Sequence, residues 1–261
     1  MMLDLIINEF PKYFPEVNNI LAAGIPIFAR IAGLMRTAPF LQRSEIPMIA
    51  KVGFTLIFTV ILSMVLKPAP PEVGVSIVYS IVINFLCGAL IGFIVNCILR
   101  AVESGGDMIN MQQGVSSAMI MDPTTSTQIS IMGRLFSLFG LIIFLKIGGA
   151  YWTFNALIRS FEIFPVYGTF VPLDEIVNMS YLIKVTSNVL YIGLQIAGPV
   201  LLATLGQDII LGIISKTAPQ VNVFTMSFLF KPCLGSAILI VVLPSLLNVI
   251  EDFFMSFANI F

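Results

Sequence analysis

Long apolar stretches without a charged residue are the first feature of the chain. They cover residues 73–99, 185–207 and 232–250. A helix needs about 20 residues to cross the roughly 30 Å of hydrocarbon in a bilayer, and each stretch is about that long or longer. The pattern therefore predicts three membrane-spanning helices, separated by segments richer in polar residues and proline.

Three further apolar stretches each tolerate a charge. They cover residues 18–35, 46–66 and 129–152. Three of the charges lie near the ends of their stretches, at Lys51, Arg134 and Lys146. A long cationic side chain in such a place can reach the membrane interface at little cost. The chain is therefore expected to be an all-α, polytopic membrane protein of about six hydrophobic segments.

Arg30 lies deeper than the other charges, inside the stretch 18–35. An unpaired guanidinium at that depth costs roughly 2.5–3.5 kcal/mol on insertion scales. We therefore expect protein rather than lipid to hold Arg30, through an acid or through carbonyls at the end of a helix. Glu103 is the expected acid within the chain, and a group of a partner chain is an equally good candidate.

Composition supports a membrane protein and excludes several classes of function. Of the 261 residues, 58% are hydrophobic and 10% charged, against roughly 45–50% and about 25% in soluble proteins. The net charge of −1 leaves no cationic surface for nucleic acid. The chain has no histidine and only three cysteines, each alone in an apolar run. His- or Cys-based metal sites and Ser-His-Asp triads are excluded, and no catalytic residue, cofactor or metal is expected.

Small residues and prolines recur inside the apolar stretches. Gly88 and Gly92 lie four positions apart. Because helices in lipid associate through close backbone approach, such pairs predict contact faces, either within this chain or with another one. Pro26 and Pro199 interrupt two other stretches, where each removes a backbone hydrogen bond. A kink is expected at both prolines.

A long connection at residues 104–127 is rich in methionine. Residues 108–121 hold four of the 13 methionines of the chain. Methionine is unbranched and deformable, so a segment of Met, Gly, Ser and Gln can pack apolar surface without a fixed shape. This property suits the plug of a pore, and an ordinary irregular loop buried among helices is the alternative. The residues assigned to the plug are Gly106, Met108, Met111, Gly114, Met119, Met121, Asp122 and Pro123.

Three acids lie in or near this connection. They are Glu103, Asp107 and Asp122. Acids at membrane depth are functional by default, so a proton relay or an ion site is one interpretation. Solvation of a loop is the other interpretation, and it is the favoured one.

A second long connection covers residues 206–231. Its apolar part, 208–216, is too short to cross a bilayer, and Pro219 is expected to end a short helix that begins near Gly206. The following turn offers two amides and an apolar surface. We expect it to dock against other chains, and the alternative is that the chain's own helices cover it. The docking residues expected here are Asp208, Gly212, Pro219, Gln220, Asn222 and Phe224.

Two stretches carry a resemblance to a known family. The first comprises residues 111–118, 122–123 and 148–152, and the second comprises residues 211–224 with the run Ala-Pro-Gln-Val-Asn-Val-Phe. Both resemble the FliR family of the flagellar export gate, the T component of the type III secretion export apparatus. Arg30, Gly88, Gly92 and Pro199 fall in a similar order and spacing, and they are also assigned to assembly or docking. The likeness covers nearly the whole chain, although Gly149-Ala150 stands where many members have Gly-His.

The resemblance implies a non-enzymatic subunit of the flagellar type III protein export gate. Such a subunit helps to form and to plug the channel through which unfolded polypeptides leave the cell. Two alternatives are a subunit of a virulence-type injectisome gate and a small-solute secondary transporter. Acids in the middle of spans and an internal repeat would favour the transporter, and neither is found in the sequence.

The resemblance also implies an architecture and a set of partners. Residues 1–180 would form a FliP-like part with the plug loop 104–127, and residues 181–261 a FliQ-like helical hairpin. The expected partners are FliP-like, FliQ-like and FlhB-like gate proteins, a FlhA-like component, exported polypeptides and membrane lipid. The expected location is the bacterial inner membrane, within the flagellar basal body.

Overall fold

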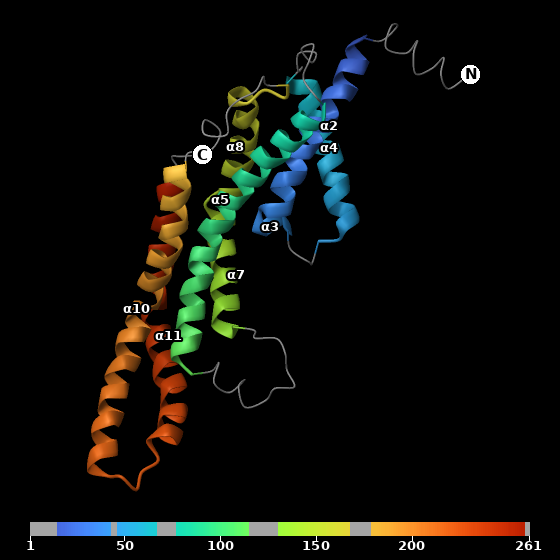
Figure 1. Ribbon diagram of the computed structural model, residues 1–261. Helices are drawn as coiled ribbons and strands as arrows, with labels where there is room; N and C mark the ends of the chain where they lie inside the picture. Colours follow the sequence, from blue (N-terminus) through green and yellow to red (C-terminus); the bar gives the residue numbers. More distant parts are fainter. Residues whose placement is uncertain (1–14, 43–45, 67–76, 115–129, 168–178, 259–261) are drawn as a thin grey trace. The chain divides into compact units, whose positions relative to one another are not determined.

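The computed structural model describes residues 15–42, 46–66, 77–114, 130–167 and 179–258, with side chains described from residue 23. All regular structure in these ranges is α-helical (Figure 1). The helices are α2 (Pro15–Thr37), α3 (Pro39–Gln42), α4 (Met48–Leu66), α5 (Ile77–Gln112), α7 (Ile131–Lys146), α8 (Gly149–Ile163), α10 (Met179–Thr217) and α11 (Val223–Ala258). The predicted all-α class is therefore confirmed.

Four described helices are long and apolar enough to cross a membrane. They contain the candidate spans Met48–Leu66, Val78–Gln112, Met179–Thr217 and Val223–Phe257, and a fifth is added if the bent pair α7 and α8 counts as one span. Helices lie in the described part of each of the six predicted hydrophobic segments, but the segment 129–152 is divided between α7 and α8, and α2 is not among the candidate spans. The chain is thus a multi-pass membrane protein with four or five candidate spans in its described residues.

Two helices are longer than the sequence predicted. α5 continues through residues 104–112, which were expected to belong to an irregular connection, because Met, Gln and Ile are acceptable in a helix. α10 continues to Thr217, so no separate helix begins near Gly206. It ends just before Pro219, as predicted. α11 begins at Val223, and Phe224 therefore lies on a helix rather than in the turn.

Proline does not end any of the helices that contain it. Pro26 lies inside α2 and Pro199 inside α10, and each helix continues past its proline. α11 likewise contains Pro232 and Pro244. The backbone interruptions predicted at Pro26 and Pro199 are therefore contained within single helices.

The chain forms two compact units that are interleaved along the sequence. The first contains residues 1–96, 151–182 and 261, and the second contains residues 97–150 and 183–260. This division differs from the predicted boundary at residue 180. That boundary concerns likeness to FliP-like and FliQ-like chains, and it stays a prediction.

The first unit has an apolar core built from α2, α4 and α8. Ile27, Ile31 and Leu34 of α2 are fully buried, and Leu62 of α4 and Leu157 of α8 pack in the same cluster. These α2 positions recur at helical spacing, so one face of α2 supplies much of the core. Partly buried side chains cover its edge, including Tyr167, whose phenol has a pKa raised by burial.

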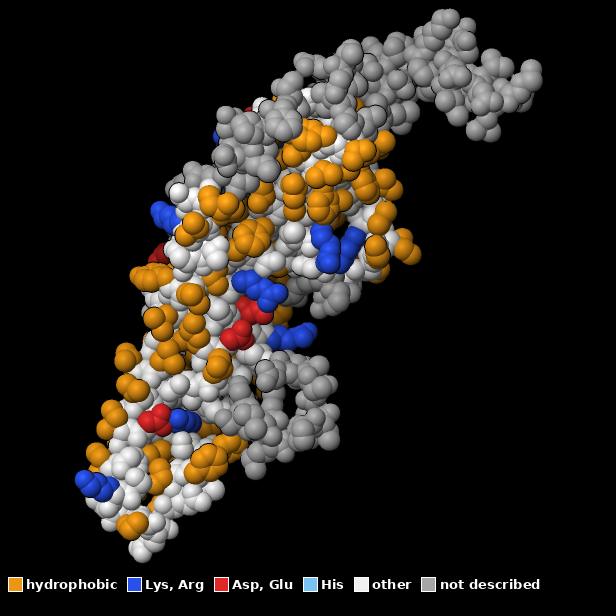
Figure 2. All heavy atoms as spheres, in the orientation of Figure 1, with side chains coloured by type: hydrophobic (Ala, Val, Ile, Leu, Met, Phe, Trp, Pro, Cys, Tyr) orange, Lys and Arg blue, Asp and Glu red, His pale blue; other side chains and the backbone are white. Residues whose placement is uncertain are grey.

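α4 buries three polar side chains beside the core residue Leu62 and is apolar on its exposed side. Thr55, Thr59 and Ser63 are buried, and each hydroxyl donates a hydrogen bond of 2.7–2.8 Å to a carbonyl of its own helix. Ile49 is 87% exposed and Val65 is 70% exposed. Figure 2 shows the resulting apolar surface over α4. This pattern is typical of a helix whose outer surroundings are lipid or other apolar helices.

The second unit contains a long helical hairpin. α10 and α11 run antiparallel on either side of the turn at residues 218–222 (Figure 1). α7 packs against α11 through Phe144 and Phe254, whose rings meet edge to face with centroids 5.8 Å apart. Figure 2 shows apolar side chains along the outside of this hairpin as well.

Candidate functional site

Arg30 is the largest fully buried side chain and joins three helices of the first unit. Its Nε donates to Asn84 Oδ1 of α5 at 2.9 Å, and Nη1 donates to Ser160 Oγ of α8 at 3.1 Å. Nη2 donates to the carbonyl of Phe164, just after α8, at 2.7 Å. The guanidinium also lies over the ring of Phe161, 4.0 Å from its centroid. Protein therefore holds Arg30, as the sequence predicted.

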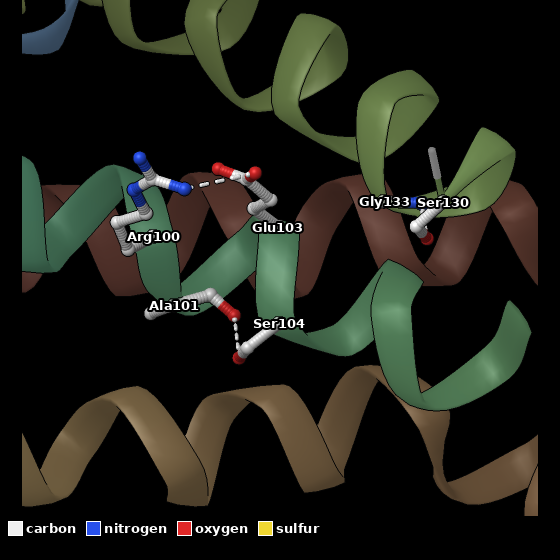
Figure 3. Close-up of polar contacts among 6 residues, drawn as sticks. All are labelled: Arg100, Ala101, Glu103, Ser104, Ser130 and Gly133. Atoms are coloured by element: carbon white, nitrogen blue, oxygen red, sulfur yellow. Dashed lines mark hydrogen bonds and ion pairs between the residues drawn. The ribbon is translucent and has the colours of Figure 1, made fainter. Parts of the chain in front are cut away.

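The prediction that Glu103 pairs with Arg30 is wrong, because this acid pairs with Arg100, one turn before it on α5 (Figure 3). The distance between Arg100 Nη1 and Glu103 Oε1 is 3.0 Å. A carbonyl at the end of a helix was the other expected partner, and the carbonyl of Phe164 fulfils it. Sequence reasoning missed Asn84. Its signal was an amide in the middle of the charge-free stretch 73–99, where a polar side chain needs a protein partner.

Asn84 is itself fixed by two backbone carbonyls. Its Nδ2 donates to Ser80 O at 2.7 Å and to Val166 O at 3.0 Å. The amide nitrogen is thereby occupied, and the oxygen points to Arg30. Asn84 thus links α5 to the segment after α8 twice, once directly and once through the guanidinium.

Gly88 and Gly92 form the contact between α5 and α2. A Cβ at Gly88 would overlap the backbone carbonyl of Arg30, and a Cβ at Gly92 would lie 2.8 Å from the backbone nitrogen of Ala38. Thr37 Oγ1 adds a hydrogen bond of 3.1 Å to the carbonyl of Ala89. The predicted helix contact face exists within this chain, and a role of the pair in contacts between chains stays a prediction.

Glycine and serine also bring α5 close to its neighbours in the second unit. A Cβ at Gly105 would lie 2.8 Å from the side chain of Ile196 on α10, and a Cβ at Gly106 would lie 2.5 Å from the carbonyl of Met132 on α7. The Ser104 hydroxyl donates to Ala101 O at 2.8 Å (Figure 3), and Val189 O on α10 also lies within hydrogen-bond distance of it, at 3.2 Å. Gly106, assigned to the plug from sequence, therefore lies at a helix contact.

The remaining residues assigned to the plug divide into two groups. Met108 and Met111 lie on α5, and Gly114 follows this helix with a φ of 74°, which glycine adopts easily. Met119, Met121, Asp122 and Pro123 lie outside the described residues. On the far side of that segment, Ser130 caps α7 by accepting a 2.9 Å hydrogen bond from the Gly133 N–H (Figure 3).

The acids of this region form no metal site in the described residues. Within them, no group of three or more His, Cys, Asp or Glu side chains lies together. Glu103 pairs with Arg100, and Asp107 lies against Gly133 in the first turn of α7, where a carboxylate is favoured by the helix dipole. The third acid of the proposed ion site, Asp122, lies outside the described residues.

The turn between α10 and α11 is capped by its own residues. Ala218 N donates to Ile214 O at 2.8 Å, and Asn222 Oδ1 accepts from the N–H groups of Phe224 and Thr225 at 3.1 and 3.3 Å. Asn222 therefore satisfies backbone groups at the start of α11, as predicted for this amide. Gln220 is exposed, and Phe224 is 74% exposed.

The other predicted docking residues lie on the body of the hairpin. Asp208 of α10 forms a 2.8 Å ion pair with Lys231 of α11 and so ties the two helices together. Gly212 is exposed, and a Cβ there would meet no atom of the described chain within 4 Å. Pro199 is half-buried within α10.

The arrangement defines a class of protein: a multi-pass helical membrane protein whose polar groups tie its helices together from inside, while its long helices present apolar surface outward. Comparison with known families adds the particular one. Residues 21–257 match the family described as bacterial export proteins, family 1. The chain belongs to this family, that of the FliR proteins.

Individual relatives cover most of the chain. The flagellar biosynthetic protein FliR of Escherichia coli (strain K12) is 26% identical over 88% of this chain and 88% of its own length. FliR of Bacillus subtilis (strain 168) is 26% identical over 92% of this chain and 93% of its own. The surface presentation of antigens protein SpaR of Salmonella typhimurium is 24% identical over 90% and 86%. The chain is thus an export component similar to both flagellar and SpaR-type proteins.

Proposed function

We propose that the chain is a non-enzymatic subunit of the flagellar type III protein export gate in the bacterial inner membrane. The observation that carries this proposal is the family match over residues 21–257. The apolar faces of α4 and of the α10–α11 hairpin support it, because they need lipid or the helices of FliP-like, FliQ-like, FlhB-like and FlhA-like chains around them.

Within this proposal, the methionine-rich segment acts as a deformable plug. The helical parts of the predicted plug, on α5, serve as its base, and the segment containing Met119 and Met121 blocks the channel. Support comes from the methionines of this segment and from the contact of Gly106 with α7. A soft apolar plug yields to an unfolded polypeptide and closes behind it.

The turn at 218–224 docks against other gate chains in the same proposal. Gln220 of the turn and Phe224 of the first turn of α11 are both exposed. An exposed amide and an exposed ring in this short segment offer both a hydrogen bond and an apolar contact. In lipid the amide would remain unsatisfied, which favours a protein partner.

A gene deletion tests the proposed function. Cells without this chain should lose swimming motility and export of flagellar subunits, and the restored gene should recover both. Mild detergent extraction of a tagged chain should isolate FliP-like and FliQ-like chains with it. Normal motility in the deletion strain would contradict the flagellar assignment.

The SpaR relative supports the second candidate, an injectisome gate subunit. In that case the deletion should abolish secretion of virulence proteins and leave swimming unchanged. The two measurements in one strain distinguish the candidates.

A further inference from the structure

An apolar groove runs between the two helices of the hairpin. Its volume is about 790 Å³, and six of its lining residues are Ala203, Gly206 and Gln207 of α10 with Phe230, Cys233 and Ile238 of α11. The α10 side extends from Ala203 to Ile214, about three helical turns. Ala203 and Gly206 are small, and a Cβ at Gly206 would meet no described atom within 4 Å. The groove therefore has room for a helix to approach the backbone closely.

Gln207 is the exception in this apolar lining. Both its Oε1 and its Nε2 are buried, and neither has a hydrogen-bond partner in the described part of the chain. A buried amide that makes no hydrogen bond is unfavourable, because it has left water without gaining a partner. The side chain has three rotatable bonds and is half-buried as a whole, so its amide can turn toward the opening of the groove. In the described part of the chain, its Nε2 has no acceptor and its Oε1 has no donor.

The charges beside the groove restrict which partner can bind in it. Asp208 follows Gln207 in the sequence, and Lys231 precedes the groove residue Cys233 by two positions, but the two charges pair with each other at 2.8 Å. The Gln207 amide therefore still requires a partner group that is neutral and that both donates and accepts a hydrogen bond. A lipid acyl chain has no such group. The backbone of a helix in a membrane is already hydrogen-bonded within the helix, so the partner group has to be a side chain.

We infer that this groove binds an apolar helix of another membrane chain of the export apparatus, which pairs an Asn or Gln side chain with Gln207. A primary amide both donates and accepts, so two amides can form two hydrogen bonds with each other. The inference rests on the proposed function, because it names the kind of partner that one face of this chain takes within the export assembly.

The test uses the full chain in phosphatidylcholine vesicles and two membrane-spanning, leucine-rich peptides. One peptide carries a single central Asn and the other carries Leu there. Energy transfer reports binding between a dye on the peptide and a dye at Ile240→Cys, an exposed position outside the groove lining, in a Cys233→Ala background that adds no polar group to the groove. Cys87 and Cys97 are buried and stay unlabelled.

The Asn peptide should bind the chain with Gln207 about three- to twenty-fold more tightly than the Leu peptide, the range of amide pairs in membranes. Gln207→Leu should reduce this advantage to less than twofold. Gly206→Leu keeps the amide but fills the groove, so both peptides should bind more weakly. Gly198→Leu is the matched control, because Gly198 also has open space on α10 but does not line the groove.

Three results would overturn the inference. They are equal binding of both peptides to the unchanged groove, an Asn advantage that persists in Gln207→Leu, and absence of binding by either peptide. The assay contains only this chain and a peptide, so any of them would leave the proposed export function intact. Failure of that function would instead appear as normal motility and export in the deletion strain.

Discussion

At the scale of single residues, the first unit depends on a buried cation and on glycines at helix contacts. Arg30 donates to two neutral side chains and one carbonyl, and these groups come from α5, α8 and the residue after α8. Such bonds are strong because the donor is charged, and they are costly to lose because every partner would keep an unsatisfied atom. Arg30 therefore fixes the positions of α2, α5 and α8 relative to one another within the first unit.

Replacing Arg30 by Met should lower the free energy of unfolding by at least about 2 kcal/mol, because the acceptors on Asn84 and Phe164 lose their donor. The measurement is the thermal unfolding midpoint of the purified chain in detergent. Arg36→Met is the matched control, since Arg36 lies on the same helix but is exposed. Equal midpoints for the two variants would show that the Arg30 contacts do not stabilise the unit.

Gly88→Ala should prevent α2 and α5 from packing, because its methyl group would overlap the carbonyl of Arg30. We expect little folded protein in the membrane, as measured by resistance to limited proteolysis. Gly53→Ala, on α4, is the control: its methyl group meets nothing within 4 Å, and alanine favours the helix by up to about 1 kcal/mol. A stable Gly88→Ala protein would refute the close contact.

At the scale of elements, the α10–α11 hairpin separates folding from docking in one short turn. Both amides of the turn are exposed, but Asn222 Oδ1 accepts two backbone N–H groups of α11 and so caps that helix. The ion pair between Asp208 and Lys231 joins the helices further along. Two neighbouring amides in the turn should therefore respond differently to substitution.

Asn222→Ala should lower the stability of the chain by about 1 kcal/mol through loss of the helix cap, and Asn222→Asp should keep most of it. Gln220→Leu should leave the unfolding midpoint of the isolated chain unchanged but reduce the amount of FliP-like or FliQ-like chain recovered with it. Unchanged recovery with Gln220→Leu would contradict docking through this residue.

The sequence predicted the elements better than their connections. The described part of every charge-free stretch proved helical, since crossing lipid leaves few other choices for a backbone. The helical continuation of α5 past Gly105 was missed, because consecutive glycines are poor in isolated helices and only the contacts with Ile196 and Met132 reveal their use. The burial of Arg30 could be predicted from depth alone. Asn84 as its partner could not, because the two are 54 positions apart.

At the scale of the whole chain, the described residues bury a few polar groups in an apolar interior and also expose many large apolar side chains, unlike a water-soluble protein. Arg30, Asn84 and the hydroxyls of α4 are buried, whereas large apolar residues are exposed on α4, α5, α10 and α11. This explains the 58% hydrophobic composition, since both the interior and the outer surface are largely apolar. It also means that a channel formed with other chains needs an apolar seal, which methionine can provide.

Replacing Met119 and Met121 by Ser should make cells leaky to small ions while the export complex still assembles, because a polar plug no longer excludes water. Ion leak is measured by the collapse of membrane potential in cells and assembly by co-isolation of gate chains. Met64→Ser is the control, as Met64 lies on α4, outside the plug, and is 59% exposed. An unchanged potential in cells with an assembled complex would exclude the plug.

The glycine contacts differ in whether a second substitution elsewhere in the chain can suppress the effect of replacing the glycine. At Gly88 the obstacle to a larger residue is the carbonyl of Arg30, and every amino acid has that carbonyl. No second substitution at position 30 can therefore suppress a Gly88 mutation. At Gly235 the obstacle is the Gln113 side chain, whose Cγ would lie 2.8 Å from the new Cβ, so a shorter residue at 113 can restore the fit. Revertants of Gly88 variants should consequently be true back-mutations, whereas those of Gly235 variants should include changes at Gln113.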